Sequence, residues 1–169
     1  MKLGVIGATL GHTASPAIHE KLFRLLGVEG EHEYGVLEMD RDRIPSELER
    51  LQQEGYTGAN VTIPYKLEVM PYLTEISREA LTIGAVNTLH FTQDGIFGYN
   101  TDYGGFGRSL QHASIDIVKK DCYVLGTGGG ARAIIQYLRD GGASTITVVS
   151  RKPHQKAGFE NFAQKLDVS

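Results

Sequence analysis

Six residues, Gly126 to Ala131, constrain the fold of this chain more than any other segment. They read Gly-Thr-Gly-Gly-Gly-Ala and connect an apolar run at residues 123–125 to a stretch with helical periodicity at residues 133–138. In a strand–turn–helix unit of this kind, backbone N–H groups and the positive end of the helix can approach a pyrophosphate unobstructed. The segment predicts a dinucleotide site, with a flexible connecting loop as the alternative. The candidate contacts are Gly126, Thr127, Gly128, Gly129 and Gly130.

The next predicted strand, residues 145–149, ends in two cations that bear on the choice of cofactor. Ser150, Arg151 and Lys152 follow it, at the position where NAD enzymes place Asp or Glu to bind the ribose 2′-hydroxyl. A guanidinium can instead bind a 2′-phosphate through two hydrogen bonds. The sequence therefore favours NADP over NAD, and the alternative is a solvated basic turn.

The N-terminal part of the chain alternates between strand-like and helix-like segments. Short apolar runs bounded by glycine occur at residues 3–6, 34–37, 58–61 and 86–91, and stretches with helical periodicity separate the first three. This alternation predicts βαβ units and a parallel sheet, which makes the chain an α/β protein.

Two helices are predicted between these strands. The first begins near Ser15 and Pro16, because Ser can cap a helix and Pro suits its first turn, and it ends before Gly27. The second carries apolar residues at helical spacing within residues 44–51.

Residues 87–98 alternate around a glycine-containing turn at residues 93–95, which predicts a hairpin that closes one edge of the sheet. A helix at residues 103–112 then leads toward the glycine turn. We therefore predict a substrate-binding domain at residues 1–102, followed at residues 103–169 by part of a Rossmann-type nucleotide-binding domain.

Composition excludes several classes of protein. There are 17 Lys and Arg against 20 Asp and Glu, and no run of five like charges occurs, so neither a nucleic acid nor a membrane is expected as a partner. With no signal peptide or membrane span and a single cysteine, the chain is expected to be cytoplasmic. Cys122 lies in an apolar run and is expected to be buried. No Cys or His pair has metal-ligand spacing, so no metal site is predicted.

Three groups of polar residues lie near strand ends or helix starts in the first predicted domain. Thr13 and Ser15 precede a helix, and two hydroxyls near a helix N-terminus suit a carboxylate, although a simple helix cap is the alternative. The other two groups lie at residues 58–66 and at residues 84–88 with 100–102. Asn, Asp and Thr are side chains that bind hydroxyl groups, so a small hydroxylated substrate is expected.

Five segments in this order resemble the shikimate dehydrogenase family, and the resemblance covers nearly the whole chain. They are His-Thr-Ala-Ser-Pro at 12–16, Asn-Val-Thr-Ile-Pro-Tyr-Lys at 60–66, Gly-Ala-Val-Asn-Thr at 84–88, Asn-Thr-Asp at 100–102 and the glycine turn at 126–130. The resemblance implies reversible hydride transfer between NADPH and the ketone of 3-dehydroshikimate, which gives shikimate for aromatic amino-acid biosynthesis.

By this resemblance, Lys66 and Asp102 are the catalytic pair. Reduction of a ketone places negative charge on its oxygen, which an ammonium stabilises and protonates. A nearby carboxylate would orient the ammonium and bind a substrate hydroxyl. Without the resemblance, the sequence predicts that Lys66 is a surface lysine and that Asp102 caps the helix that follows it.

The resemblance also assigns substrate contacts. Thr13 and Ser15 would bind the carboxylate, and the ring hydroxyls would be bound by Thr62, Asn87 and Asp102, with Asn60 as a weaker candidate. Thr13 stands where the family more often has serine, and its methyl group leaves quinate, or both acids, as an alternative substrate.

Members of the family continue beyond the point that this chain reaches, through further strands and a terminal helix that returns to the first domain. We therefore expect weak or absent activity from this chain alone, and a non-catalytic binding module is a further alternative. An unpaired sheet edge would favour a homodimer.

Overall fold

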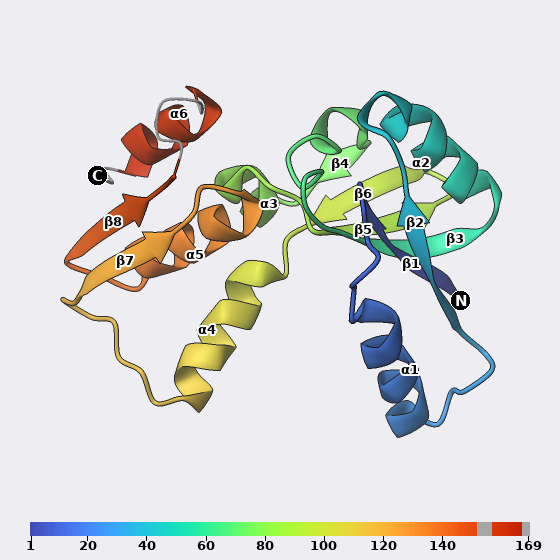
Figure 1. The fold of residues 1–169 in the computed structure, drawn as a ribbon, viewed down its shortest axis with the longest axis horizontal. Coiled ribbons are helices and arrows are strands. Elements are labelled where there is room, and N and C mark those ends of the chain that lie inside the picture. Colours follow the sequence, from blue (N-terminus) through green and yellow to red (C-terminus); the bar gives the residue numbers. More distant parts are fainter. Residues whose placement is uncertain (152–156, 167–169) are drawn as a thin grey trace. The chain divides into compact units, whose positions relative to one another are not determined.

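The computed structural model describes residues 1–151 and 157–166, and it shows an α/β fold, as predicted (Figure 1). The chain divides into two compact units. The first unit comprises residues 1–80 and 86–99, and the second comprises residues 81–85 and those from 100 onward.

The first unit is built on a six-stranded mixed sheet with the order β2-β1-β3-β5-β6-β4. Strand β1 pairs in parallel with β2 and β3, whereas β5 pairs antiparallel with β3 and β6. The strands are β1 (Lys2–Gly7), β2 (Glu33–Glu38), β3 (Tyr56–Val61), β4 (Glu75–Ile76), β5 (Thr88–Thr92) and β6 (Gly95–Tyr99).

The hairpin β5–β6 forms as predicted, but the prediction that it closes the sheet edge was wrong. The two-residue strand β4 pairs with β6 and lies outside it. Backbone hydrogen bonds from Thr74 to Ile96 and from Ser77 to Gly98 hold β4 there. A strand this short leaves no periodic pattern in the sequence.

Two helices lie on opposite faces of this sheet, α1 (Ser15–Leu26) and α2 (Ile44–Gln53) (Figure 1). Helix α2 buries Ile44, Leu48 and Leu51 in the main core. The 3-10 turns Arg41–Arg43 and Met70–Tyr72 and the helix α3 (Arg78–Ile83) complete the connections.

Helix α1 has the predicted extent, and Gly27 ends it with a φ of 70°. The prediction that Ser15 caps this helix was wrong, because Ala14 occupies the cap position and Ser15 is the first helical residue. The hydroxyl of Ser15 is therefore available for other contacts.

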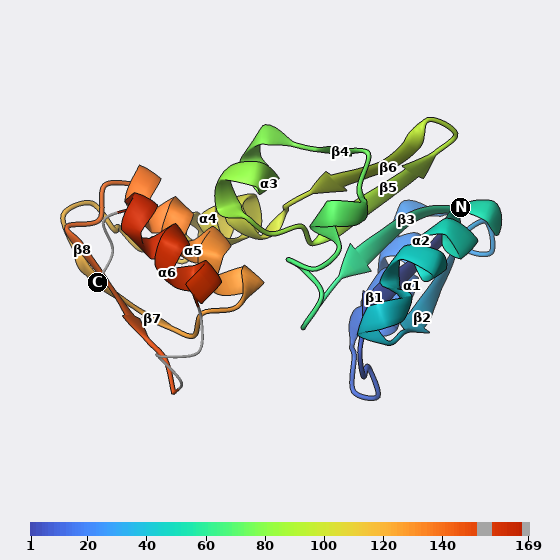
Figure 2. The same ribbon diagram turned by 90° about the horizontal axis from the view of Figure 1, so that it is seen from above.

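The second unit contains a two-stranded parallel sheet with helices on one face (Figure 2). Its elements are α4 (Asp102–His112), β7 (Asp121–Leu125), α5 (Gly129–Asp140), β8 (Thr145–Val149) and α6 (Ala157–Leu166). Val124, Ile135, Ile146 and Phe162 form its core. Cys122 packs at the margin of this core and is half-buried, so the prediction of a buried thiol was wrong in degree.

Within the described ranges, none of the helices combines the length and apolar composition that a membrane crossing requires. The same part of the chain contains no group of three or more Cys, His, Asp and Glu side chains that could hold a metal ion.

Candidate functional site

The loop between β1 and α1 is held in place by its backbone. Leu10 is buried, and its N–H donates to the carboxylate of Glu38 over 2.5 Å. The N–H of Thr13 donates to the carbonyl of Leu10 over 2.9 Å. Thr13 is thus fixed just ahead of α1, where its hydroxyl lies 3.2 Å from that of Ser15.

These two hydroxyls continue into a chain of polar contacts that reaches β3. The side chain of Ser15 hydrogen-bonds with the hydroxyl of Tyr34, which donates to Oδ1 of Asn60 over 2.7 Å. Three predicted site residues, Thr13, Ser15 and Asn60, therefore form one network. Sequence reasoning missed Tyr34 because it lies in an apolar run that read only as a strand.

Beyond β3, a turn places Thr62 and Lys66. The N–H of Thr62 donates to the carbonyl of Ile6 over 2.9 Å. Tyr65 anchors the turn, because its ring is buried in the core and its hydroxyl donates to the carbonyl of Met39 over 2.6 Å. Lys66 is half-buried, unlike the surface lysine that its sequence alone suggests.

Asn87 lies beside this turn. The N–H of Val61 donates to the carbonyl of Asn87 over 2.8 Å, and the N–H of Val86 donates to that of Lys66 over 2.7 Å. The side chain of Asn87 is buried, and its Oδ1 accepts a hydrogen bond from Thr88. Strand β3 ends at Val61, the residue after Asn60. In the first unit, Thr62, Lys66 and Asn87 thus lie around this end of the strand.

Asp102 belongs to the second unit, where it begins α4. Asn100 fixes its backbone, because the Oδ1 of Asn100 accepts the N–H of Asp102 over 3.0 Å while its Nδ2 donates to the carbonyl of Ala85 over 2.9 Å. Asn100 is only 4% exposed. It acts as a scaffold for Asp102, and Thr101, not Asp102, caps the helix.

The glycine turn leaves its backbone uncovered by other protein atoms. Gly126 adopts a φ of 117°, and Gly128 is the extended cap residue of α5. A methyl group added at Gly126, Gly128 or Gly130 would meet no protein atom within 4 Å. The backbone here is thus accessible from outside, so these residues fit the phosphates of a dinucleotide. Thr127 and Gly129 lie in the same segment.

The glycine turn is tied to the end of β8. The N–H of Gly126 donates to the carbonyl of Val149 over 2.9 Å, so Ser150 and the exposed Arg151 follow directly beside the turn. Lys152, the third residue predicted here, lies outside the described residues.

Arg132, the cation closest in sequence to the glycine turn, has a structural role. It is 7% exposed, its Nη2 donates to the carbonyl of Gly158 over 2.7 Å, and its guanidinium lies 4.8 Å from the ring centroid of Phe162. Burial lowers the pKa of this guanidinium. Arg132 therefore holds α6 against α5.

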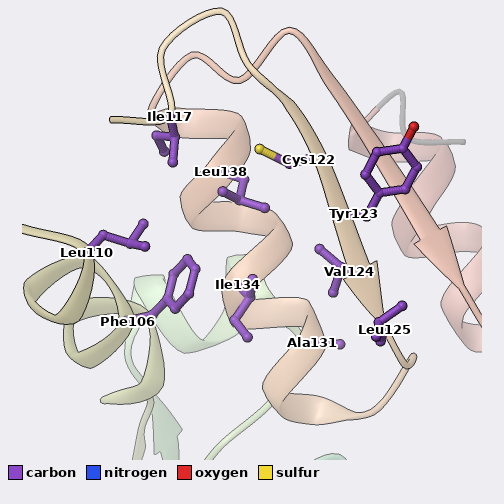
Figure 3. Close-up of a pocket in the computed structure, with 10 residues that line it drawn as sticks. All are labelled: Phe106, Leu110, Ile117, Cys122, Tyr123, Val124, Leu125, Ala131, Ile134 and Leu138. Carbon is purple, nitrogen blue, oxygen red and sulfur yellow. The ribbon is translucent and has the colours of Figure 1, made fainter. Parts of the chain in front are cut away.

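An apolar groove of about 420 Å³ also lies in the second unit, along β7. Figure 3 shows Phe106 and Leu110 on one side, Ile134 and Leu138 of α5 at the base, and Val124 on the other side. The groove presents almost no polar side chains, so it lacks the groups needed to bind a hydroxylated acid or a phosphate.

Comparisons with known proteins identify a protein family and individual relatives that this chain resembles. Residues 5–89 match the family described as "Shikimate dehydrogenase substrate binding domain". A relative from Clostridium perfringens, named "Shikimate dehydrogenase (NADP(+))", is 47% identical over 163 residues. The match covers 96% of this chain and 59% of the relative, so the chain spans about three fifths of that protein's length.

Solved structures resemble the whole described fold. The shikimate 5-dehydrogenase of Thermus thermophilus, in complex with NADP(H) and shikimate, has a TM-score of 0.86 at 31% identity, over 99% of this chain and 61% of that one. The enzyme from Listeria monocytogenes, in complex with shikimate and NAD, has a TM-score of 0.84 at 29% identity, over 98% and 57%.

Proposed function

Because this chain belongs to the shikimate dehydrogenase family, we propose that its first unit binds shikimate or 3-dehydroshikimate and that its second unit binds NADP. The reaction is the reversible reduction of the 3-dehydroshikimate ketone. The observation that carries the proposal is the convergence of the Thr13 and Ser15 hydroxyls, 3.2 Å apart, at the start of α1.

The substrate carboxylate is bound by these two hydroxyls. Each can turn its proton from its present partner to one carboxylate oxygen, and the positive end of α1 favours the negative charge. The ring hydroxyls are bound by Asn60, Thr62 and Asn87 around the end of β3, and by Asp102. A substrate that lacked one of these hydroxyls would leave a polar group unpaired, which gives the pocket its selectivity.

Lys66 acts on the reacting oxygen. When bound, the nicotinamide cofactor supplies the hydride to the carbonyl carbon. The carbon–oxygen π bond breaks, negative charge develops on the oxygen, and the Lys66 ammonium stabilises that charge and transfers a proton to it. The carboxylate of Asp102 binds a substrate hydroxyl.

The cofactor is NADP. The glycine segment Gly126–Gly130 would receive the pyrophosphate, and Ser150, Arg151 and Lys152 would receive the 2′-phosphate. The exposed guanidinium of Arg151 beside the turn supports this choice. Since one related structure carries NAD, both nucleotides should be titrated against the chain and against Arg151→Gln. We expect the variant to weaken NADP binding about tenfold or more and to leave NAD binding nearly unchanged.

The function is tested by calorimetric titration of the 169-residue chain with shikimate, quinate and NADP, followed by the rate of NADPH formation with each acid. Binding of shikimate without turnover would favour a binding module, and equal rates with both acids would favour a quinate/shikimate enzyme. Failure to bind either acid would overturn the proposal. The cytoplasmic location and the homodimer remain predictions.

A further inference from the structure

Tyr34, at the start of β2, occupies a central place in the polar network of the first unit. Its ring stacks on the ring of His19 of α1, with centroids 3.7 Å apart and planes inclined by 14°. Nδ1 of His19 in turn lies 2.9 Å from the carbonyl oxygen of Ser15. The ring of Tyr34 is therefore held against the first turn of α1, which carries the predicted carboxylate contact.

The hydroxyl of Tyr34 joins two predicted subsites. It donates to Oδ1 of Asn60 over 2.7 Å and hydrogen-bonds with Ser15. A phenol has one proton to donate. That proton goes to Asn60, so the phenol oxygen is left with acceptor capacity only.

The hydrogen bond from Tyr34 fixes the orientation of the Asn60 side chain. An amide has an oxygen that accepts and an NH₂ group that donates, and they lie on opposite sides of the amide carbon. With its oxygen bound to Tyr34, Asn60 turns its NH₂ group away from Tyr34. The amide is thus prepared to donate to an oxygen of a ligand.

We propose that Tyr34 is a positioning residue of the substrate pocket, which orients the Asn60 amide as a donor to a ring hydroxyl oxygen. This inference rests on the proposed function and adds a residue to its site. Burial raises the pKa of Tyr34, and the hydrogen bond with Ser15 offsets part of that increase. Tyr34 therefore stays protonated at neutral pH and keeps its proton for Asn60.

Tyr34→Phe tests the role, because it removes only the hydroxyl and keeps the ring that stacks on His19. In the ligand-free chain, the side-chain NH₂ signals of Asn60, followed by NMR, should move and broaden as the amide loses its fixed orientation. The dissociation constant for shikimate should rise about tenfold, as expected for the loss of one to two hydrogen bonds, while that for NADP stays constant. Tyr72→Phe, at an exposed tyrosine of the same unit, is the control.

A double-mutant cycle distinguishes positioning from a general structural effect. If Tyr34 acts through Asn60, the combined loss of affinity in Tyr34→Phe/Asn60→Ala should be smaller than the product of the two single losses. A general loss of stability would instead weaken shikimate and NADP binding together. Should Tyr34→Phe not fold, Asn60→Asp keeps an acceptor for Tyr34 but removes the NH₂ donor, and its affinity for shikimate should also fall.

The outcomes separate the two proposals. Wild-type affinity for shikimate in Tyr34→Phe or in Asn60→Asp, or unmoved Asn60 signals in Tyr34→Phe, would overturn the role of Tyr34. If the unaltered chain does not bind shikimate but the Asn60 signals respond to Tyr34→Phe, the proposed function fails and the positioning of Asn60 stands.

Discussion

Asn100 shows how a motif residue can support a site without facing it. Both ends of its amide are used internally, one by Ala85 and the other by the N–H of Asp102. We predict that Asn100→Ala lowers the free energy of unfolding by about 1–3 kcal/mol, because two buried groups lose their partners. Urea unfolding measures this, with the exposed Gln111→Ala as the matched control. Equal midpoints for both variants would contradict the scaffold role.

Tyr65 gives the first unit a dependence on alkaline pH. Its pKa is raised above 10.0, mainly by burial and then by the charge of Asp40. The folded chain holds this proton more tightly than the unfolded chain. The stability that the protonated Tyr65 contributes is therefore fully present below pH 10 and is lost as the pH rises through the pKa of the folded state. The free energy of unfolding should therefore fall above that pH. Tyr65→Phe should show a shallower fall in the same titration, and an unchanged slope would argue against this assignment.

The sequence predicted some residues of the candidate site but not others. Thr13, Ser15 and Asn60 carry hydroxyl or amide groups near a helix start or strand end, and such positions predict ligand contacts. The role of Tyr34 could not be predicted, because it depends on β2 and β3 flanking β1 on the two sides, a pairing that local patterns do not specify. The cap assignment of Ser15 was wrong by one residue, as helix ends often are.

At the scale of elements, α1 and α2 have similar sequence patterns but different surroundings. Helix α2 buries Leu48, which is 1% exposed, whereas α1 leaves Ile18, Leu22, Leu25 and Leu26 exposed, Leu25 by 74%. We predict that Leu48→Ala costs about 2–5 kcal/mol of unfolding free energy and that Leu25→Ala changes it by less than about 0.5 kcal/mol. Thermal and urea unfolding of the two variants compare these costs directly. A loss in Leu25→Ala as large as that in Leu48→Ala would contradict this prediction.

Most of the long helices and strands could be predicted, because apolar residues recur with a regular period along them. Helices α2 and α5 are examples. The strand β4 could not, since two residues that pair only with β6 carry no pattern of their own. Without it, the hairpin β5–β6 was predicted at the edge of the sheet. The hairpin itself was predicted correctly. The error came from strand β4, which lies between the 3-10 turn Met70–Tyr72 and helix α3.

For the whole molecule, the chain spans 59% of the length of its Clostridium perfringens relative. We predict that a polypeptide limited to these 169 residues forms NADPH more slowly than the full-length relative by a factor on the order of 100 or more, because small misplacements of reacting groups have effects of that size. Parallel assays of both proteins at saturating shikimate and NADP measure the difference. Equal rates from preparations of verified mass would refute it.

The division of the chain at residues 80/81, 85/86 and 99/100 has a consequence for dissecting the protein. The polypeptide passes between the two units three times, so a single cut in the sequence cannot release either of them intact. A fragment that begins at Asn100 would lack the Ala85 carbonyl to which that side chain donates. A cut at 99/100 would keep each hydrophobic core on one fragment, but it would leave the segment 81–85 of the second unit on the fragment that carries the first unit.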